Sequence, residues 1–122
     1  MAKLNTTHDS LRQMEKDSGN IYIPESKRNP ELIFDKNKGY FYLGGRSMPD
    51  NANDFYLPVF KEVDDYLENP GEETRVVFKL DYLDSSSSQL ILALIYKLKN
   101  LVNDKKQLRI EWHYMEDDYD IL

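Results

Sequence analysis

The segment Thr74–Val102 reads TRVVFKLDYLDSSSSQLILALIYKLKNLV, and its hydrophobic period changes in the middle. From Thr74 to Asp84 apolar and polar residues alternate, which is typical of a strand with one face in water. We expect the buried face of that strand to carry Val76, Phe78, Leu80 and Tyr82. From Ser86 to Val102 the apolar residues recur at helical spacing. The segment therefore predicts a strand that leads into a helix.

A second alternating run follows the helix, from Leu108 to Tyr114, and includes Ile110 and Trp112 on its apolar side. Strands joined through a helix are usually parallel, and the crossover is usually right-handed. We therefore expect a parallel strand-helix-strand unit in the C-terminal half.

The N-terminal half predicts a hairpin and one more helix. Glu31–Asp35 and Tyr40–Gly44 are rich in strand formers and flank a turn-like stretch, DKNKG. Gly44–Asn51 is expected to be a loop, and Asn53–Glu68 an amphipathic helix that ends at Asn69. The expected fold class is an α/β two-layer sandwich, in which about four strands form a mixed sheet and both helices pack on one face.

Length and composition limit the possible functions. The 122 residues suffice for one domain, expected at residues 21–122 after a mobile N-terminal arm at residues 1–20. A net charge of −6 disfavours nucleic acid as a partner, and no apolar run is long enough to predict a membrane span. Without cysteines or a secretory signal, a cytoplasmic location is expected. His8 and His113 lack ligand spacing, so no metal or other cofactor is expected.

Four serines, Ser85–Ser88, stand where the strand gives way to the helix. Ser86 with Gln89 has the spacing of a capping box, and Asp84 or Ser85 could also cap the helix. Capping needs one or two of these side chains, and the surplus suggests a site of phosphorylation. A helix N-terminus tolerates a phosphate, which adds about −1.5 to −2 charges at neutral pH. A docking partner would have to desolvate that charge.

Three motifs resemble a known family when taken together. Gly44–Ala52, followed by Phe55-Tyr56 and Pro58, is similar to a "GRS-P-NA" signature. Leu80–Ser87 is similar to a "YxNTSS" segment, and the chain from Trp112 to Asp118 resembles a "W-Y-DEDD" ending. The family is that of the SiaC-type regulatory phosphoproteins, and the resemblance runs from about Ile21 to the C-terminus.

The resemblance implies a fold like that of the STAS anti-sigma-factor antagonists and a signalling role. It implies phosphorylation by a serine/threonine kinase of the histidine-kinase-like ATPase type and dephosphorylation by a PPM-type phosphatase. In the unphosphorylated form, the protein would bind and activate a diguanylate cyclase, raise cyclic di-GMP and promote biofilm or aggregation. The family's modified threonine matches Ser85, while Ser86 is a rival because the antagonists use a serine within Asp-Ser-Ser.

The docking surface is expected around these serines and at the loop that begins at Arg46, which lies at the same edge of the sheet. The expected partner-binding residues are Arg46, Ser47, Asp84, Ser87, Leu90, Ala93 and Lys97. An alternative is a constitutive interaction or scaffold domain whose serines serve only as a cap. A small enzyme is a third reading, but the serines lack the glycine-flanked turn of a hydrolase, so we expect no enzyme activity.

Overall fold

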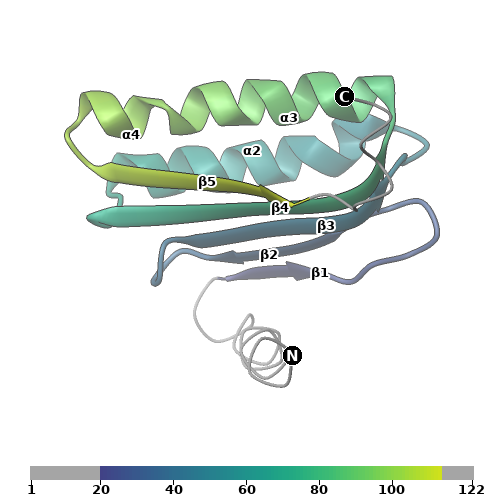
Figure 1. Ribbon diagram of the computed structural model, residues 1–122, viewed down its shortest axis with the longest axis horizontal. Helices are drawn as coiled ribbons and strands as arrows, with labels where there is room; N and C mark the ends of the chain where they lie inside the picture. Colours follow the sequence, from purple (N-terminus) through teal and green to yellow (C-terminus); the bar gives the residue numbers. More distant parts are fainter. Residues whose placement is uncertain (1–19, 114–122) are drawn as a thin grey trace.

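The computed structural model describes residues 20–113, and most of the expected N-terminal arm lies outside them. A five-stranded sheet forms one layer, and the helices form the other (Figure 1). The elements in chain order are β1 (Ile21–Ile23), β2 (Glu31–Asp35), β3 (Tyr40–Ser47), α2 (Ala52–Glu68), β4 (Glu73–Leu83), α3 (Ser85–Leu98), α4 (Asn100–Asn103) and β5 (Gln107–His113).

The strands follow one another across the sheet in sequence order, from β1 to β5. β1, β2 and β3 pair antiparallel, whereas β3, β4 and β5 pair parallel. This confirms the expected hairpin and the parallel β4-α3-β5 unit. The sheet has five strands instead of four because Ile21–Ile23 pairs with β2, a segment too short to read as a strand from its sequence alone.

The core lies between the sheet and the two long helices, as the hydrophobic patterns predict. The strands contribute Leu32, Phe34, Phe41, Leu43, Val76 and Phe78, all at most 1% exposed. The helices contribute Tyr56, Val59, Val63, Ile91, Leu94 and Leu98. Burying each large apolar side chain stabilises the fold by roughly 1.5–3 kcal/mol, so this layer contact holds the domain together.

The structure corrects the expected path of the chain at three places. Gly44–Ser47 continues β3 instead of forming a loop, with a bulge between Gly45 and Arg46. The φ angle of Gly45 is +93°, which a glycine adopts without strain. Tyr82 is 52% exposed instead of buried, because β4 has no β5 partner beyond Lys79 in the described residues.

The third correction concerns the helix expected over Ser86–Val102. α3 ends at Leu98, and the short α4 follows after Lys99.

No helix in the part of the chain that the structure describes has the length and apolar character needed to cross a membrane.

Candidate functional site

The serine run forms the first turn of α3, at the edge of the sheet where β4 ends. Asp84 is the N-cap, and its carboxylate accepts a hydrogen bond of 2.8 Å from the backbone N–H of Ser87. Among the capping residues considered from the sequence, the structure selects Asp84. Ser85 and Ser86 are therefore the first two residues of the helix, and both are exposed. Their hydroxyls are accessible to a modifying enzyme.

Ser87, the third serine, belongs to a buried cluster of three hydroxyls. The Ser47 hydroxyl lies 2.6 Å from the Tyr56 hydroxyl and donates a hydrogen bond of 2.8 Å to Ser87. All three residues are 0% exposed. Burial raises the pKa of Tyr56 to about 12, although its hydrogen bonds with the two serines oppose the rise. The cluster joins β3, α2 and α3 directly beneath the exposed serines.

This burial changes the role of two expected partner-binding residues. Ser47 and Ser87 have no exposed surface, so neither side chain can touch a docked protein in this conformation. The backbone carbonyl of Ser47 also accepts a hydrogen bond of 3.0 Å from the N–H of Asp84, which fixes the start of α3 to the end of β3. Ser47 and Ser87 therefore stabilise the start of α3 and are not part of its exposed surface.

The N-terminus of α2 reaches the same place as the N-terminus of α3. Asn51 caps α2, and its side chain accepts a hydrogen bond of 3.1 Å from the N–H of Asp54. Between the two helix starts lies a hollow of about 350 Å³. Its lining consists of Asp50, Asn51, Ala52 and Asn53 from the start of α2 and Ser86, Gln89 and Leu90 from α3. Two positive helix ends therefore border the hollow that Ser86 lines.

Ser85 and Ser86 face different sides of α3. Successive residues in an α-helix are about 100° apart, so the Ser85 side chain is directed away from the hollow that Ser86 lines. Ala93 and Lys97 follow Ser86 along the α2 side of the helix. Lys97 makes an ion pair of 3.0 Å with Asp64 of α2.

We call the outward-facing boundary between α2 and α3 the interhelical seam, made of Leu57, Phe60, Leu90, Ala93, Asp64 and Lys97. Leu57 is 59% exposed, Ala93 is exposed and Leu90 is half-buried. The Lys97 ammonium lies 5.8 Å from the centre of the Phe60 ring. The seam thus has an apolar middle, a charged pair at one end and Ser86 near the other. The α3 residues Leu90, Ala93 and Lys97 were expected from the sequence, whereas the α2 residues were not, because helical periodicity alone does not show which neighbour faces α3.

Arg46 is exposed in β3, after the bulge, and lies opposite Tyr82 in the register of β3 with β4. It is therefore at the same end of the sheet as the serine run. Within the described residues, no ion pair involves its guanidinium. The expectation that Arg46 contacts a phosphate or a partner stays a prediction.

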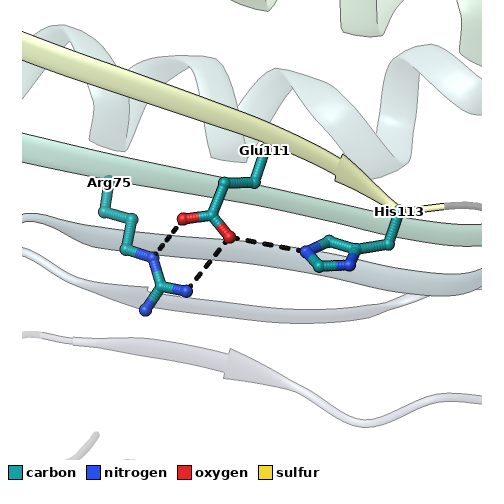
Figure 2. A network of polar contacts seen from close by, with 3 residues as sticks. All are labelled: Arg75, Glu111 and His113. Atoms are coloured by element: carbon teal, nitrogen blue, oxygen red, sulfur yellow. Dashed lines mark hydrogen bonds and ion pairs between the residues drawn. The ribbon is translucent and has the colours of Figure 1, made fainter.

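A second polar group lies on the sheet face opposite the helices (Figure 2). Arg75 of β4 donates hydrogen bonds of 2.7 and 3.1 Å to the Glu111 carboxylate of β5, and His113 lies 3.4 Å from the same carboxylate. The hydrogen bonds from Arg75 are the largest cause that lowers the pKa of Glu111 to about 2. Within residues 20–113, no cluster of three His, Asp or Glu side chains is suited to hold a metal ion. This network braces the β4–β5 pair.

The chain is similar to one known protein family and to a protein of Pseudomonas aeruginosa. The family model described as "SiaC family regulatory phosphoprotein" matches residues 23–122. A protein of Pseudomonas aeruginosa strain UCBPP-PA14, named "Uncharacterized protein PA14_02130", is 22% identical over 94 residues, which cover 77% of this chain and 75% of that one.

Two solved structures share the fold at 22% identity. Apo-SiaC from Pseudomonas aeruginosa superposes with a TM-score of 0.76, covering 82% of this chain and 83% of that one. SiaC from the same organism, solved as the activator in complex with the diguanylate cyclase SiaD, also gives a TM-score of 0.76, with 83% of each chain covered.

Proposed function

The chain belongs to the SiaC family of regulatory phosphoproteins, and on that premise we propose that it is a phosphorylation-controlled protein-interaction switch. Its unphosphorylated form binds and activates a diguanylate cyclase, and phosphorylation at the start of α3 releases that partner. The observation that carries the proposal is the pair of exposed hydroxyls of Ser85 and Ser86 at the first turn of α3, where Ser86 lines the hollow at the end of the interhelical seam.

The docking surface in this proposal is the interhelical seam together with the hollow at its Ser86 end. Its apolar middle provides surface for a partner to bury, and the nearby serines are neutral until they are modified. A phosphate would bring about −1.5 to −2 charges to that surface. Unless the partner supplies a cation, desolvating this charge on docking costs several kcal/mol. The partner therefore prefers the unmodified form.

The local structure suits a serine that alternates between the two forms. A phosphate on Ser85 or Ser86 is close to the free backbone N–H groups of the first turn of α3, which stabilise negative charge. The carboxylate of Asp84 works against this through like-charge repulsion. The free N–H groups keep the modified start of α3 folded. The repulsion from Asp84 keeps the phosphate from binding tightly there, so the phosphate stays accessible for removal.

The remaining partners follow from the family resemblance. We propose a serine/threonine kinase of the histidine-kinase-like ATPase type and a PPM-type phosphatase as the opposing enzymes, with all partners meeting in the cytoplasm. The protein itself acts as a regulator and catalyses no reaction. Raised cyclic di-GMP then promotes biofilm formation or aggregation.

A substitution series at the serine run tests the switch. Ser85→Ala, Ser86→Ala and the double variant should bind the cyclase like the wild type, and the alanine at the modified position should abolish phosphorylation by the kinase. An aspartate at that position should weaken cyclase binding at least tenfold, whereas Ser88→Ala, an exposed serine of the same run, is the matched control. Equal binding by every variant, with no phosphate found in cells by mass spectrometry, would instead support the constitutive scaffold.

A second series tests the interhelical seam. Ala93→Glu and Leu57→Glu place charge on its exposed residues and should weaken binding of the unphosphorylated protein to the cyclase at least tenfold. Lys79→Glu, on the opposite sheet face, is the control and should bind normally. Normal binding by both seam variants would move the docking surface elsewhere, without affecting the assignment of the phosphorylated serine.

A further inference from the structure

β5 lies at one edge of the sheet that residues 20–113 form. In the described residues it pairs with β4 alone. Ile110 and Trp112, on its helix-facing side, are 37% and 44% exposed, although strand positions of this kind are usually buried. An open edge flanked by apolar side chains is a template for pairing with another strand.

The geometry points to a second copy of this chain as the occupant: we infer that two copies pair antiparallel through β5, in a register centred on Ile110. Ile110 is the midpoint of Gln107–His113, so this register overlaps the whole described part of both strands. Such a dimer has twofold symmetry, the commonest form of homo-oligomer. The inference goes beyond the proposed switch and does not depend on it.

The charges of β5 select this register. Centred on Ile110, the pairing sets Arg109 of each copy opposite Glu111 of the other on the open face. On the helix face it sets Leu108 opposite Trp112. Shifting the centre by one residue sets either Arg109 against Arg109 or Glu111 against Glu111, and like charges directly opposite are destabilising. The strand is therefore complementary to itself in one full-length register.

The helix layer fits the same arrangement. A twofold axis normal to the sheet leaves the helices of both copies on one face. α3 is the crossover helix between the parallel strands β4 and β5, so we expect it over these two strands and the two copies of α3 two strand spacings apart. With neighbouring strands about 4.8 Å apart, this separation is close to the usual distance between packed helices, roughly 8–10 Å.

The side of α3 turned away from α2 carries apolar residues that this contact would cover. Leu92 is 52% exposed, Val102 of the following α4 is 59% exposed, and Ile95 is half-buried. Ser86 and the interhelical seam lie on the other side of α3. The dimer therefore leaves the interhelical seam and the hollow at its Ser86 end open.

Sedimentation and tryptophan fluorescence of the full chain test this inference. We expect a concentration-dependent species of twice the 14.4 kDa of one chain. Trp112 is the single tryptophan of the sequence, so its emission should shift to the blue as the dimer forms. A wild type that stays at the mass of one chain up to millimolar concentration overturns the inference.

Charge reversal tests the register itself. Arg109→Glu alone and Glu111→Lys alone should each be monomeric, because each brings like charges together twice. Mixing these two variants should restore a dimer, because both cross-strand pairs are then of opposite charge. Lys79→Glu is the matched control and should dimerise like the wild type.

If Glu111→Lys does not fold, as judged by circular dichroism, Ile110→Asp at the centre of the register is measured in its place. Ile110→Asp should be monomeric, whereas Lys79→Glu should still dimerise. A dimer that survives both Ile110→Asp and Arg109→Glu, or a mixture that stays monomeric when both components are folded, refutes pairing through β5.

Discussion

Removing the Ser47 hydroxyl should destabilise the domain more than removing either of its partners. Ser47 is the central member of the buried cluster and contacts both Tyr56 and Ser87. Ser47→Ala removes two buried hydrogen bonds and leaves Tyr56 and Ser87 with only each other as partners, and each lost bond costs roughly 1 kcal/mol. We expect a loss of about 2 kcal/mol in the free energy of unfolding, against a typical total of roughly 5–15 kcal/mol.

The comparison variant is Tyr56→Phe, which removes an outer hydroxyl. Ser47 then keeps Ser87 as its partner, and the expected loss is only about 1 kcal/mol. The triple variant with alanine at both serines and phenylalanine at Tyr56 has no unpaired hydroxyl left. It should lose less stability than the sum of the three single changes, because the effects of residues in one network are not additive.

Urea unfolding followed by circular dichroism measures these differences. In thermal unfolding, a domain of this size shifts by roughly 4 °C per kcal/mol, so Ser47→Ala should melt about 8 °C below the wild type. If Ser47→Ala loses no more stability than Tyr56→Phe, or the triple variant loses the sum of its single changes, the three hydroxyls do not act as a network.

Three further predictions follow from the same geometry. Asp84→Ala should cost about 1 kcal/mol of stability in urea unfolding, since it removes the N-cap of α3, whereas Asp84→Asn should cost little. Because burial raises the pKa of Tyr56 to about 12 from an ordinary value of 10, its neutral form stabilises the fold fully below pH 10. That contribution is lost as pH rises through 12, and Tyr56→Phe should flatten the fall. The lowered pKa of Glu111 has the opposite sign, so the contribution of its pair with Arg75 is present above pH 4.5 and lost as pH falls through about 2. Glu111→Gln should flatten the acid side of the stability profile.

The local hydrophobic pattern of the sequence predicted most of the fold, and the predictions that were wrong share a physical cause. The alternation in β4 and β5 and the helical spacing in α2 and α3 identified the elements, because each buries one face. The two glycines at Gly44–Gly45 read as a loop, but they continue β3 through a bulge that only pairing with β4 defines. Tyr82 follows the alternation of its strand yet is exposed, because within the described residues β5 does not extend beside that end of β4.

The candidate site was predictable only in part, for the same reason. The exposed positions Ser85, Ser86 and Ala93 follow from one helix read on its own. Burial of Ser87 depends on Ser47, 40 residues earlier, and no periodicity shows that contact. The α2 half of the interhelical seam is likewise set by how two helices pack.

The bond from Asp84 to the backbone of Ser47 also bears on how fast the protein can respond. The end of β3 and the starts of α2 and α3 are fastened to one another beneath the two accessible serines. A phosphate added to Ser85 or Ser86 would not require any of these segments to refold before its charge affects a partner. The delay between stimulus and output would then be set by the turnover of the enzymes that add and remove the group, and a slow conformational phase after modification is not expected.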